Sequence, residues 1–319
     1  PSNFKNKNYQ NLLDFFFNDK KLKAILSAHV GLLGLPPNRV SAFAMALTII
    51  SYLKDGTFYP KGGAQNLADI IKNKFIEYGG ALIINNKIIK VILKNDKIYS
   101  ITSNLKNTFR AIDFIFSIDP NEMLKYMTTP NSAITKYKKT LNNFQRSFSL
   151  FILYLGVEMK SKDIKKIIGW HFKSFDINKH FFDLLLVSSP TLNDKSLCNK
   201  DNHHSIEIFQ FVNNKSINIA ETDRLKNTFI DKILFRFDRK IKNIVFKETA
   251  SPKTIERYTG NSKGAVYGWE NTASQVYKNR LPYQTPISNL YLVGHWCSFG
   301  SGIVPVFLTA KKVANVLSK

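Results

Sequence analysis

The sequence predicts an α/β fold in which two domains are interleaved. Its 319 residues are enough for roughly two domains at about 150 residues each. Apolar residues recur with helical spacing in some segments and with strand spacing in others. No internal repeat and no low-complexity linker divides the chain. The two domains are therefore expected to share segments along the chain.

The N-terminal part is expected to be helical. Over residues 8–30 apolar side chains recur near the helical period, at Leu12, Phe16, Leu22 and Leu26. Gly34-Leu-Pro-Pro37 breaks this pattern. The uncharged stretch from Val40 to Leu53 then predicts a second helix, buried or interfacial, which is too short to span a bilayer.

The next segment is expected to change from helix to strands. Tyr59-Pro-Lys-Gly-Gly63 predicts a tight turn before a helix that ends at Gly79-Gly80. The apolar face of this helix is formed by Leu67, Ile70, Ile71 and Phe75. Polar turns then separate three expected strands of an antiparallel meander, Ala81–Ile84, Ile88–Leu93 and Lys97–Ile101. A fourth, almost wholly apolar strand is expected at Phe114–Ile118.

The middle of the chain is expected to hold long strands and one basic helix. The strand-like runs are Leu150–Val157, Phe182–Val187 and Ser205–Val212. A basic amphipathic helix is expected between Ile219 and Val245. Its apolar face is formed by Leu225, Phe229, Ile233 and Phe237.

A strand–turn–helix unit near the C-terminus is the strongest local motif. A buried strand at Leu290–Val293 leads into a glycine-rich turn, and a helix starts near Ile303. Gly300 and Gly302 let the backbone approach a ligand without a Cβ in the way. The free N–H groups and the positive end of the helix dipole suit a phosphate or the pyrimidine end of a flavin. An ordinary βα turn that needs glycine only for tightness is the alternative.

Three other motifs were weighed as functional sites, and none of them predicts one. Gly260-Asn-Ser-Lys-Gly264 matches the hydrolase elbow as a string, but no buried strand precedes it and no helical period follows it. Cys198, His203 and His204 do not form a tetrahedral set of ligands, so no metal site is predicted. No GxGxxG loop for a dinucleotide is found at any glycine.

The chain is strongly basic, with a formal net charge of +23. The basic residues are 38 Lys and only 8 Arg, and a phosphate-binding protein would be expected to use more Arg. An anionic membrane surface is the favoured partner, with a compositional bias as the alternative. No nucleic-acid-binding motif accompanies the charge. Two widely spaced cysteines and the lack of a visible signal peptide favour a cytoplasmic location, peripheral on a membrane.

Taken together, these segments resemble the superfamily of FAD-dependent carotenoid desaturases, carotenoid isomerases and retinol saturases, the phytoene dehydrogenase-like proteins. The resemblance is carried by Gly34–Pro37 with Ser41–Met45, Tyr59–Gly63 with Gly79–Ala81, Leu186–Thr191, His203–Phe211, Ser251–Asn261 with Gly264–Trp269, and Thr285–Trp296 with its Gly-Ser-Gly turn. These matches follow the family's order along nearly the whole chain.

The resemblance implies the C-terminal part of a Rossmann-like FAD/NAD(P)-binding fold, interleaved with a substrate domain of antiparallel sheet and helices. Residues 1–57 would form a helical cap or substrate region, and residues 58–120 a segment of the FAD domain. Residues 121–280 would form the substrate domain, and residues 281–319 the last segment of the FAD domain.

The resemblance also implies site residues. The strand around Ile89 would meet the adenine end of FAD, and Gly294 and His295 would lie along the ribityl-pyrophosphate. The flavin pyrimidine would meet backbone N–H groups of Gly302, Ile303 and Val304. The substrate would contact Tyr59 and Lys61 near the flavin, with Tyr258 and Tyr267 as candidates for the cavity wall. No catalytic acid or base is identified.

The sequence departs from the family pattern at Ser117-Ile-Asp119 and at Gly300-Ser-Gly302, and it lacks the N-terminal strand–GxGxxG–helix. An upstream segment is therefore expected to carry that unit. The expected function is that of an FAD-dependent desaturase, saturase or isomerase acting on a polyene or isoprenoid lipid. The alternative is a flavin-free, non-enzymatic basic fragment that binds membranes or acidic partners.

Overall fold

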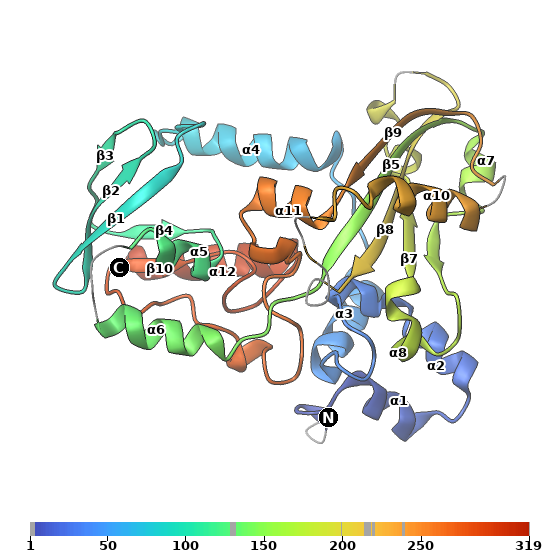
Figure 1. Ribbon diagram of the computed structural model, residues 1–319, viewed down its shortest axis with the longest axis horizontal. Coiled ribbons are helices and arrows are strands. Elements are labelled where there is room, and N and C mark those ends of the chain that lie inside the picture. The colour runs from blue at the N-terminus through green and yellow to red at the C-terminus, as the bar shows by residue number, and fades with distance from the viewer. Residues whose placement is uncertain are drawn as a thin grey trace.

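The computed structural model describes residues 4–127, 132–198, 200–213, 218, 221–237 and 240–318. Two lobes lie side by side along the long axis of the molecule (Figure 1). One lobe, here called the C-terminal lobe, contains the short strands β1–β4 and β10 and the last helix. The other, the sheet lobe, contains a five-stranded sheet and the N-terminal helices. The mixed α/β fold predicted from the sequence is confirmed.

The N-terminal helices pack against one end of the sheet lobe. They are α1 (Tyr9–Phe16), α2 (Lys20–Leu26), the 3₁₀ helix η2 (Ala28–Leu33) and α3 (Ala42–Asp55). The helical prediction for residues 8–30 holds, but the chain is extended at Phe17, and Asp19 caps the new helix by accepting from the backbone N–H of Leu22 at 2.8 Å. Helix α3 buries Met45 and leaves Leu53 83% exposed, so it is an interfacial helix as predicted.

Helix α4 (Gly63–Glu77) lies across the top of the C-terminal lobe in Figure 1. It ends before Gly79, as predicted. The apolar face predicted for this helix is not packed, however, because Ile70 and Phe75 are 57% and 50% exposed. The strand predicted at Ala81–Ile84 is wrong. Among the described residues no strand lies beside this segment to share its backbone hydrogen bonds, and its apolar side chains remain exposed.

The C-terminal lobe has two small sheets around one core. Strands β1 (Ile88–Lys94), β2 (Lys97–Ser103) and β3 (Thr108–Phe109) pair antiparallel, which confirms the two predicted strands in this region. Strand β4 (Phe114–Phe116) pairs in parallel with β10 (Leu290–Leu292), far away in sequence. The Asn289 side chain joins the two sheets: it accepts from Ile98 N at 2.8 Å and donates to the carbonyls of Ile98 and Ile112.

The core of the C-terminal lobe draws on distant segments of the chain. Helices α5 (Pro120–Lys125) and α6 (Ser132–Asn142) supply Met123 and Tyr137 to it. Trp269 and Trp296 meet edge to face in the same core, with ring centroids 4.8 Å apart. Helix α12 (Ile303–Leu317) closes the lobe, and it starts at the residue predicted from the sequence.

The sheet lobe is built on an antiparallel sheet of order β6-β7-β8-β5-β9. Its strands are β5 (Ser149–Glu158), β6 (Gly169–His171), β7 (Leu185–Ser188), β8 (His203–Val212) and β9 (Ile244–Ala250). The predicted strands at 150–157 and 205–212 are confirmed. The first half of the strand predicted at 182–187 is instead the 3₁₀ turn η3 (Phe181–Asp183), which buries Phe181 beside Phe211.

Helix α10 (Lys226–Arg236) covers one face of this sheet with Phe229, Ile230 and Ile233. The predicted basic helix is therefore present but shorter: its expected start at Ile219 lies outside the described residues, and Val245 belongs to β9. The remaining short helices are α7 (Ser161–Ile164), α8 (Ile177–His180), α9 (Pro190–Asn193), η4 (Lys195–Leu197), α11 (Pro252–Thr259), η6 (Ser262–Gly264) and η7 (Tyr277–Asn279). No helix in the described part of the chain is both long and apolar enough to cross a bilayer.

Candidate functional site

The glycine-rich turn between β10 and α12 is open where the sequence predicts a ligand. The first helical residues, Ile303 and Val304, are 60% and 69% exposed. Gly302 precedes them with φ +112°, a conformation that L side chains rarely adopt. Because β4 and β10 are parallel, the residues that follow them lie at the same edge of the sheet. Gly294 follows β10 and Ser117 follows β4, and a Cβ on Gly294 would lie 3.4 Å from Ser117 Oγ. The turn thus presents exposed backbone at the carboxyl edge of the β4–β10 pair.

An apolar cavity of about 280 Å³ adjoins this turn. Helix α3 contributes Phe43 and Leu47 to its wall, and the turn contributes Gly300. The remaining lining residues include Val276, Tyr277, Phe299, Pro305 and Leu308. The cavity therefore joins an apolar surface to the exposed backbone of the turn.

Arg280 holds the turn in place from beneath. Its side chain is almost fully buried and makes its hydrogen bonds to main-chain carbonyls and one amide. The guanidinium donates to the carbonyls of His295 and Tyr267 at 2.7 and 2.9 Å. It also donates to Glu270 O, Gln275 O and Asn271 Oδ1. Burial lowers the pKa of Arg280 to about 10, so that it stays cationic at neutral pH.

His295 lies in the turn with a buried nitrogen that lacks a partner. Among the described residues nothing forms a hydrogen bond with its Nε2. Burial, and then the nearby Arg280 cation, lower the pKa of His295 to about 4, against an opposing effect of Asp119. The imidazole is therefore neutral at pH 7, and within the described residues its Nε2 is a buried polar atom without a hydrogen-bond partner.

The depressed pKa of His295 predicts a loss of stability in mild acid. The unfolded chain binds a proton near pH 6.5 and the folded chain only near pH 4, so stability is fully present above pH 6.5 and falls as the pH drops toward 4. The loss is expected to reach about 3 kcal/mol, at ~1.4 kcal/mol per pKa unit. Urea unfolding of the wild type and His295→Asn at pH 7.5 and pH 5 measures the part of this loss that is reached by pH 5, about 2 kcal/mol. A pH dependence equal in both proteins would contradict the assignment.

Ser262, the central residue of the Gly260–Gly264 string, is not a nucleophile. Its hydroxyl donates to the fully buried Asp119 carboxylate, and its backbone N–H donates to the same oxygen at 3.1 Å. The segment forms the short turn η6 and not the start of a helix. The expectation that this string is no hydrolase elbow is therefore confirmed by its structure.

The Tyr59–Gly63 turn is anchored to the sheet lobe. Asp194, at the end of α9, accepts a hydrogen bond from Gly62 N at 2.5 Å. A Cβ on Gly63 would lie 3.3 Å from Leu197 Cδ2 and 3.9 Å from Tyr59 Oη. Tyr59 and Lys61 therefore sit between the two lobes and remain partly or fully exposed.

The other predicted site residues occupy separate places. Ile89 is 49% exposed on β1, in a different sheet from Gly294. Tyr258 is 77% exposed on α11. Tyr267 is buried, and its hydroxyl donates to Gly31 O at 2.9 Å, so the hydroxyl has a structural partner. Sequence reasoning missed Arg280 and Asp119, for which no spacing signal exists.

Cys198, His203 and His204 have other partners. Cys198 Sγ donates to His203 O at 2.8 Å, and the His203 ring lies 3.0 Å from Glu158. The His204 ring lies between Thr191 and Ser161. In the described ranges no three His, Cys, Asp or Glu side chains are grouped to hold a metal ion.

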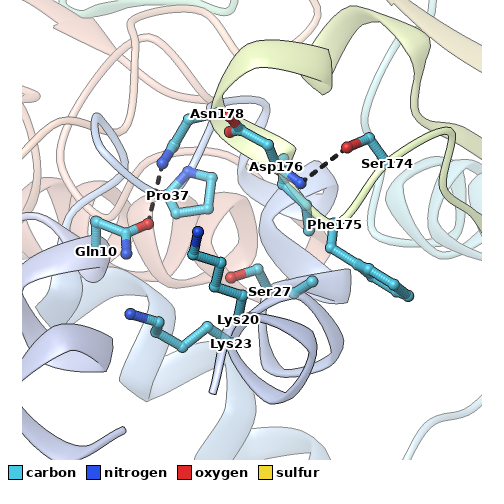
Figure 2. A pocket seen from close by; sticks show the side chains of 11 residues that line it. Gln10, Lys20, Lys23, Ser27, Pro37, Ser174, Phe175, Asp176 and Asn178 are labelled. Atoms are coloured by element: carbon cyan, nitrogen blue, oxygen red, sulfur yellow. Dashed lines mark hydrogen bonds between the residues drawn. The ribbon is translucent and has the colours of Figure 1, made fainter. Parts of the chain in front are cut away.

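A second, polar groove lies at the N-terminal helices (Figure 2). It has a volume of about 460 Å³ and is lined by Lys20 and Lys23 of α2 together with residues 174–178. Asn178 closes one side by donating to Gln10 Oε1 at 3.0 Å. None of its lining residues belongs to the glycine-rich turn, and its walls mix polar side chains with Pro37, Phe175 and Ile177.

Comparison with known proteins finds several enzymes that are similar to this chain. No model of a known protein family matches the chain. The chain is 26% identical over 279 residues to prolycopene isomerase 2 of an Oncidium hybrid cultivar, covering 82% of this chain and 46% of that protein. It is 23% identical over 356 residues to all-trans-retinol 13,14-reductase of Danio rerio, covering 98% and 58%. It is also 23% identical over 331 residues to a 4,4'-diapophytoene desaturase of Methylomonas, covering 98% and 64%. The chain thus spans about half to two thirds of these relatives.

Solved structures show the same fold. An oxidoreductase from Methanosarcina mazei superposes with a TM-score of 0.70 at 17% identity, covering 98% of this chain and 68% of that one. A putrescine oxidase variant superposes with a TM-score of 0.64 at 14% identity, covering 99% and 69%. The fold of this chain is therefore shared with known oxidoreductases.

Proposed function

We propose that the chain, which is similar to a carotenoid isomerase, a retinol reductase and a diapophytoene desaturase, is the substrate-binding and flavin-contacting part of an FAD-dependent oxidoreductase of that superfamily. Its substrate would be a polyene or isoprenoid lipid. The observation that carries this proposal is the apolar cavity beside Gly300, at the exposed N-terminus of α12. The reaction belongs to the desaturase, saturase or isomerase type.

The residues around the turn fit the flavin end of FAD. The open backbone of Gly302, Ile303 and Val304 would hold the pyrimidine carbonyls, and Gly294 and His295 would line the ribityl chain. The orphaned Nε2 of His295 supports this fit. Ile89 would lie near the adenine end. When bound, the flavin would supply the hydride chemistry, while Arg280 keeps the turn in place.

The apolar cavity fits a polyene because such a molecule has no ionisable group. Its binding free energy must come from burial of apolar surface, at about 25 cal/mol per Å². Phe43, Leu47 and Leu308 supply that surface on two helices. Tyr59 and Lys61 would border the substrate path, and Tyr258 and Tyr267 would contribute to the cavity wall only at places separate from that turn.

Two unpacked apolar helix faces fit a further folding unit. Ile70, Ile71 and Phe75 of α4 are about half exposed, as are Phe307 and Leu308 of α12. Exposed apolar faces of this kind mark interaction surfaces. A strand–GxGxxG–helix unit would cover them and supply the N–H groups for the FAD pyrophosphate.

A flavin-free basic fragment is the second candidate. It is favoured by one observation: no GxGxxG loop occurs in the sequence. Mixing the chain with the upstream unit, FAD and a polyene distinguishes the two candidates, with a reductant added in one series and an electron acceptor such as a quinone in a second, because saturation needs a reductant and desaturation needs an oxidant. Loss or gain of a conjugated double bond, read from the polyene absorption, supports the enzyme. An unchanged polyene spectrum together with no bound flavin supports the fragment.

Binding to an anionic membrane is expected from the charge of +23. Helix α10 does not supply an apolar membrane face, since Phe229 and Ile233 are buried against the sheet. Its outward face carries Lys232 together with Asp231 and Phe235, which is 86% exposed. Co-sedimentation with phosphatidylserine vesicles should be strong at low salt and fall steeply at high salt, with phosphatidylcholine vesicles as the control. Equal binding to both vesicle types at every salt concentration would contradict an electrostatic surface.

A further inference from the structure

A groove of about 710 Å³ lies at the outer end of the sheet lobe. One wall is formed by the end of β5 and by α7, and the other by the segment that joins α10 to β9. Figure 1 shows α7 and α10 at the end of the molecule that is far from the C-terminal lobe. This lysine groove is lined by two carboxylates and by Lys160, Lys162, Lys166, Lys240 and Lys242.

The two walls of the lysine groove are joined by hydrogen bonds and by buried side chains. The backbone carbonyl of Asn243 accepts from Glu158 N at 3.0 Å, and its side chain donates to Glu158 O at 3.3 Å. The backbone N–H of Lys242 donates to Met159 Sδ at 3.4 Å. Met159 and Ile167 line the groove and are also buried in the core of the sheet lobe. Contacts between two distant segments of the chain therefore fix the groove.

Both carboxylates of the lysine groove already have partners. Asp163 Oδ1 lies 2.8 Å from Lys166 Nζ, and Glu158 Oε1 lies 3.0 Å from His203 Nε2. The remaining lysines are exposed, and they are Lys160, Lys162, Lys240 and Lys242. Within the described residues none of these four forms an ion pair. Four positive charges around one groove repel one another, so an anionic partner is stabilised there.

Exposed apolar side chains accompany these lysines on both walls. Phe235 lies in the last turn of α10 and is 86% exposed. The backbone N–H of Lys240 donates to Phe237 O at 2.9 Å, so this lysine directly follows that turn. On the other wall Ile168 follows Ile167 and is 42% exposed. Lysines beside exposed apolar side chains are typical of surfaces that bind anionic membranes.

We propose that the lysine groove, with Phe235 and Ile168 at its rim, is the surface by which this chain docks on an anionic membrane. The ammonium groups contact lipid phosphates, and the Phe235 ring enters the bilayer interface. The apolar rim favours a bilayer over a nucleic-acid duplex, whose backbone would meet the lysines but bury no apolar side chain. This inference rests on the membrane binding expected under the proposed function and names its surface.

The position of the lysine groove is compatible with the flavin site. The groove lies on the sheet lobe, whereas the exposed first turn of α12 and the unpacked face of α4 lie with the C-terminal lobe (Figure 1). A membrane at the outer end of the sheet lobe therefore leaves both of these surfaces free for the cofactor and for a further folding unit.

Two double variants that lose the same charge test the surface. Lys160→Gln with Lys242→Gln removes one lysine from each wall, and Lys90→Gln with Lys97→Gln removes two exposed lysines from β1 and β2 of the C-terminal lobe. Partition onto phosphatidylserine vesicles is measured by co-sedimentation at about 0.1 M salt, where charges more than about 10 Å from the surface are screened. The groove pair should lower the partition coefficient about twentyfold, at roughly fivefold per lysine. The control pair should lower it less than about threefold.

Contact of the rim with the bilayer is read from an added tryptophan. In Phe235→Trp the added fluorescence should be quenched by brominated phosphatidylcholine mixed into the phosphatidylserine vesicles. Ile112→Trp is the matched control and should not be quenched, because Ile112 is 89% exposed but lies between β3 and β4 in the C-terminal lobe. Circular dichroism checks that every variant is folded.

Three results would overturn the inference. An equal loss of vesicle binding in the two double variants would assign the binding to total charge. Equal quenching of Phe235→Trp and Ile112→Trp, or no quenching of either, would remove Phe235 from the bilayer. Tighter binding of duplex DNA than of vesicles, lost in the groove pair, would assign the groove to nucleic acid. Vesicle binding is measured on the full chain without flavin, so its failure and a failure to bind FAD are distinguishable.

Discussion

A strand–GxGxxG–helix unit fused ahead of residue 1 is expected to give this chain stoichiometric FAD, whereas the chain alone retains none after gel filtration. The physical reason is that the pyrophosphate carries two negative charges and needs the N–H groups and dipole of a helix N-terminus. The turn at Gly302 can serve only one end of the cofactor. Visible absorption of the purified proteins, with and without the fused unit, measures the difference.

Within the fused protein, Gly302→Val is expected to abolish flavin retention. A valine at φ +112° is strained, and its side chain would fill the approach to the first turn of α12. Gly260→Val is the matched control, because Gly260 also has a positive φ, of +68°, but no atom lies within 4 Å of its Cβ position. FAD retained by Gly302→Val would refute the assignment of the turn. Tight FAD in the chain alone would refute the need for the added unit.

Arg280→Met is expected to lower the free energy of unfolding by about 3–5 kcal/mol. Methionine fills the same space but leaves the carbonyls of His295, Tyr267 and Glu270 without their donor in a buried place. Each such loss costs roughly 1–3 kcal/mol. Urea unfolding followed by circular dichroism measures the effect.

Arg257→Met serves as the control for this experiment, because Arg257 is exposed on α11 and its change should cost less than about 0.5 kcal/mol. A loss below ~1 kcal/mol in Arg280→Met would show that the carbonyls find other donors. The assignment of Arg280 as the support of the glycine-rich turn would then be wrong.

The elements with a strong periodic pattern could be predicted from the sequence. Strand β5 coincides with an almost unbroken apolar run, Leu150–Val157, and its bounds differ from the prediction by one residue at each end. The start of α12 follows from the glycines before it. The strand predicted at Ala81–Ile84 failed because its pattern is that of a strand while its pairing depends on a neighbour that no local pattern supplies.

The candidate site could be predicted only in part, for a similar reason. The glycine-rich turn is contiguous in sequence, so its chemistry could be predicted from the sequence alone. Arg280 acts through carbonyls from two separate segments, one around Tyr267 and Glu270 and one at His295. Contacts of this kind depend on the tertiary fold and leave no spacing in the sequence.

The parallel pairing of β4 with β10 has a consequence for the order of folding. All five strands of the larger sheet lie between these two in the chain. During synthesis the larger sheet can therefore form before β4 pairs with β10, because pairing between strands far apart in sequence is slow. Until the final residues leave the ribosome, the apolar edge of β4 is exposed to chaperones and to other nascent chains.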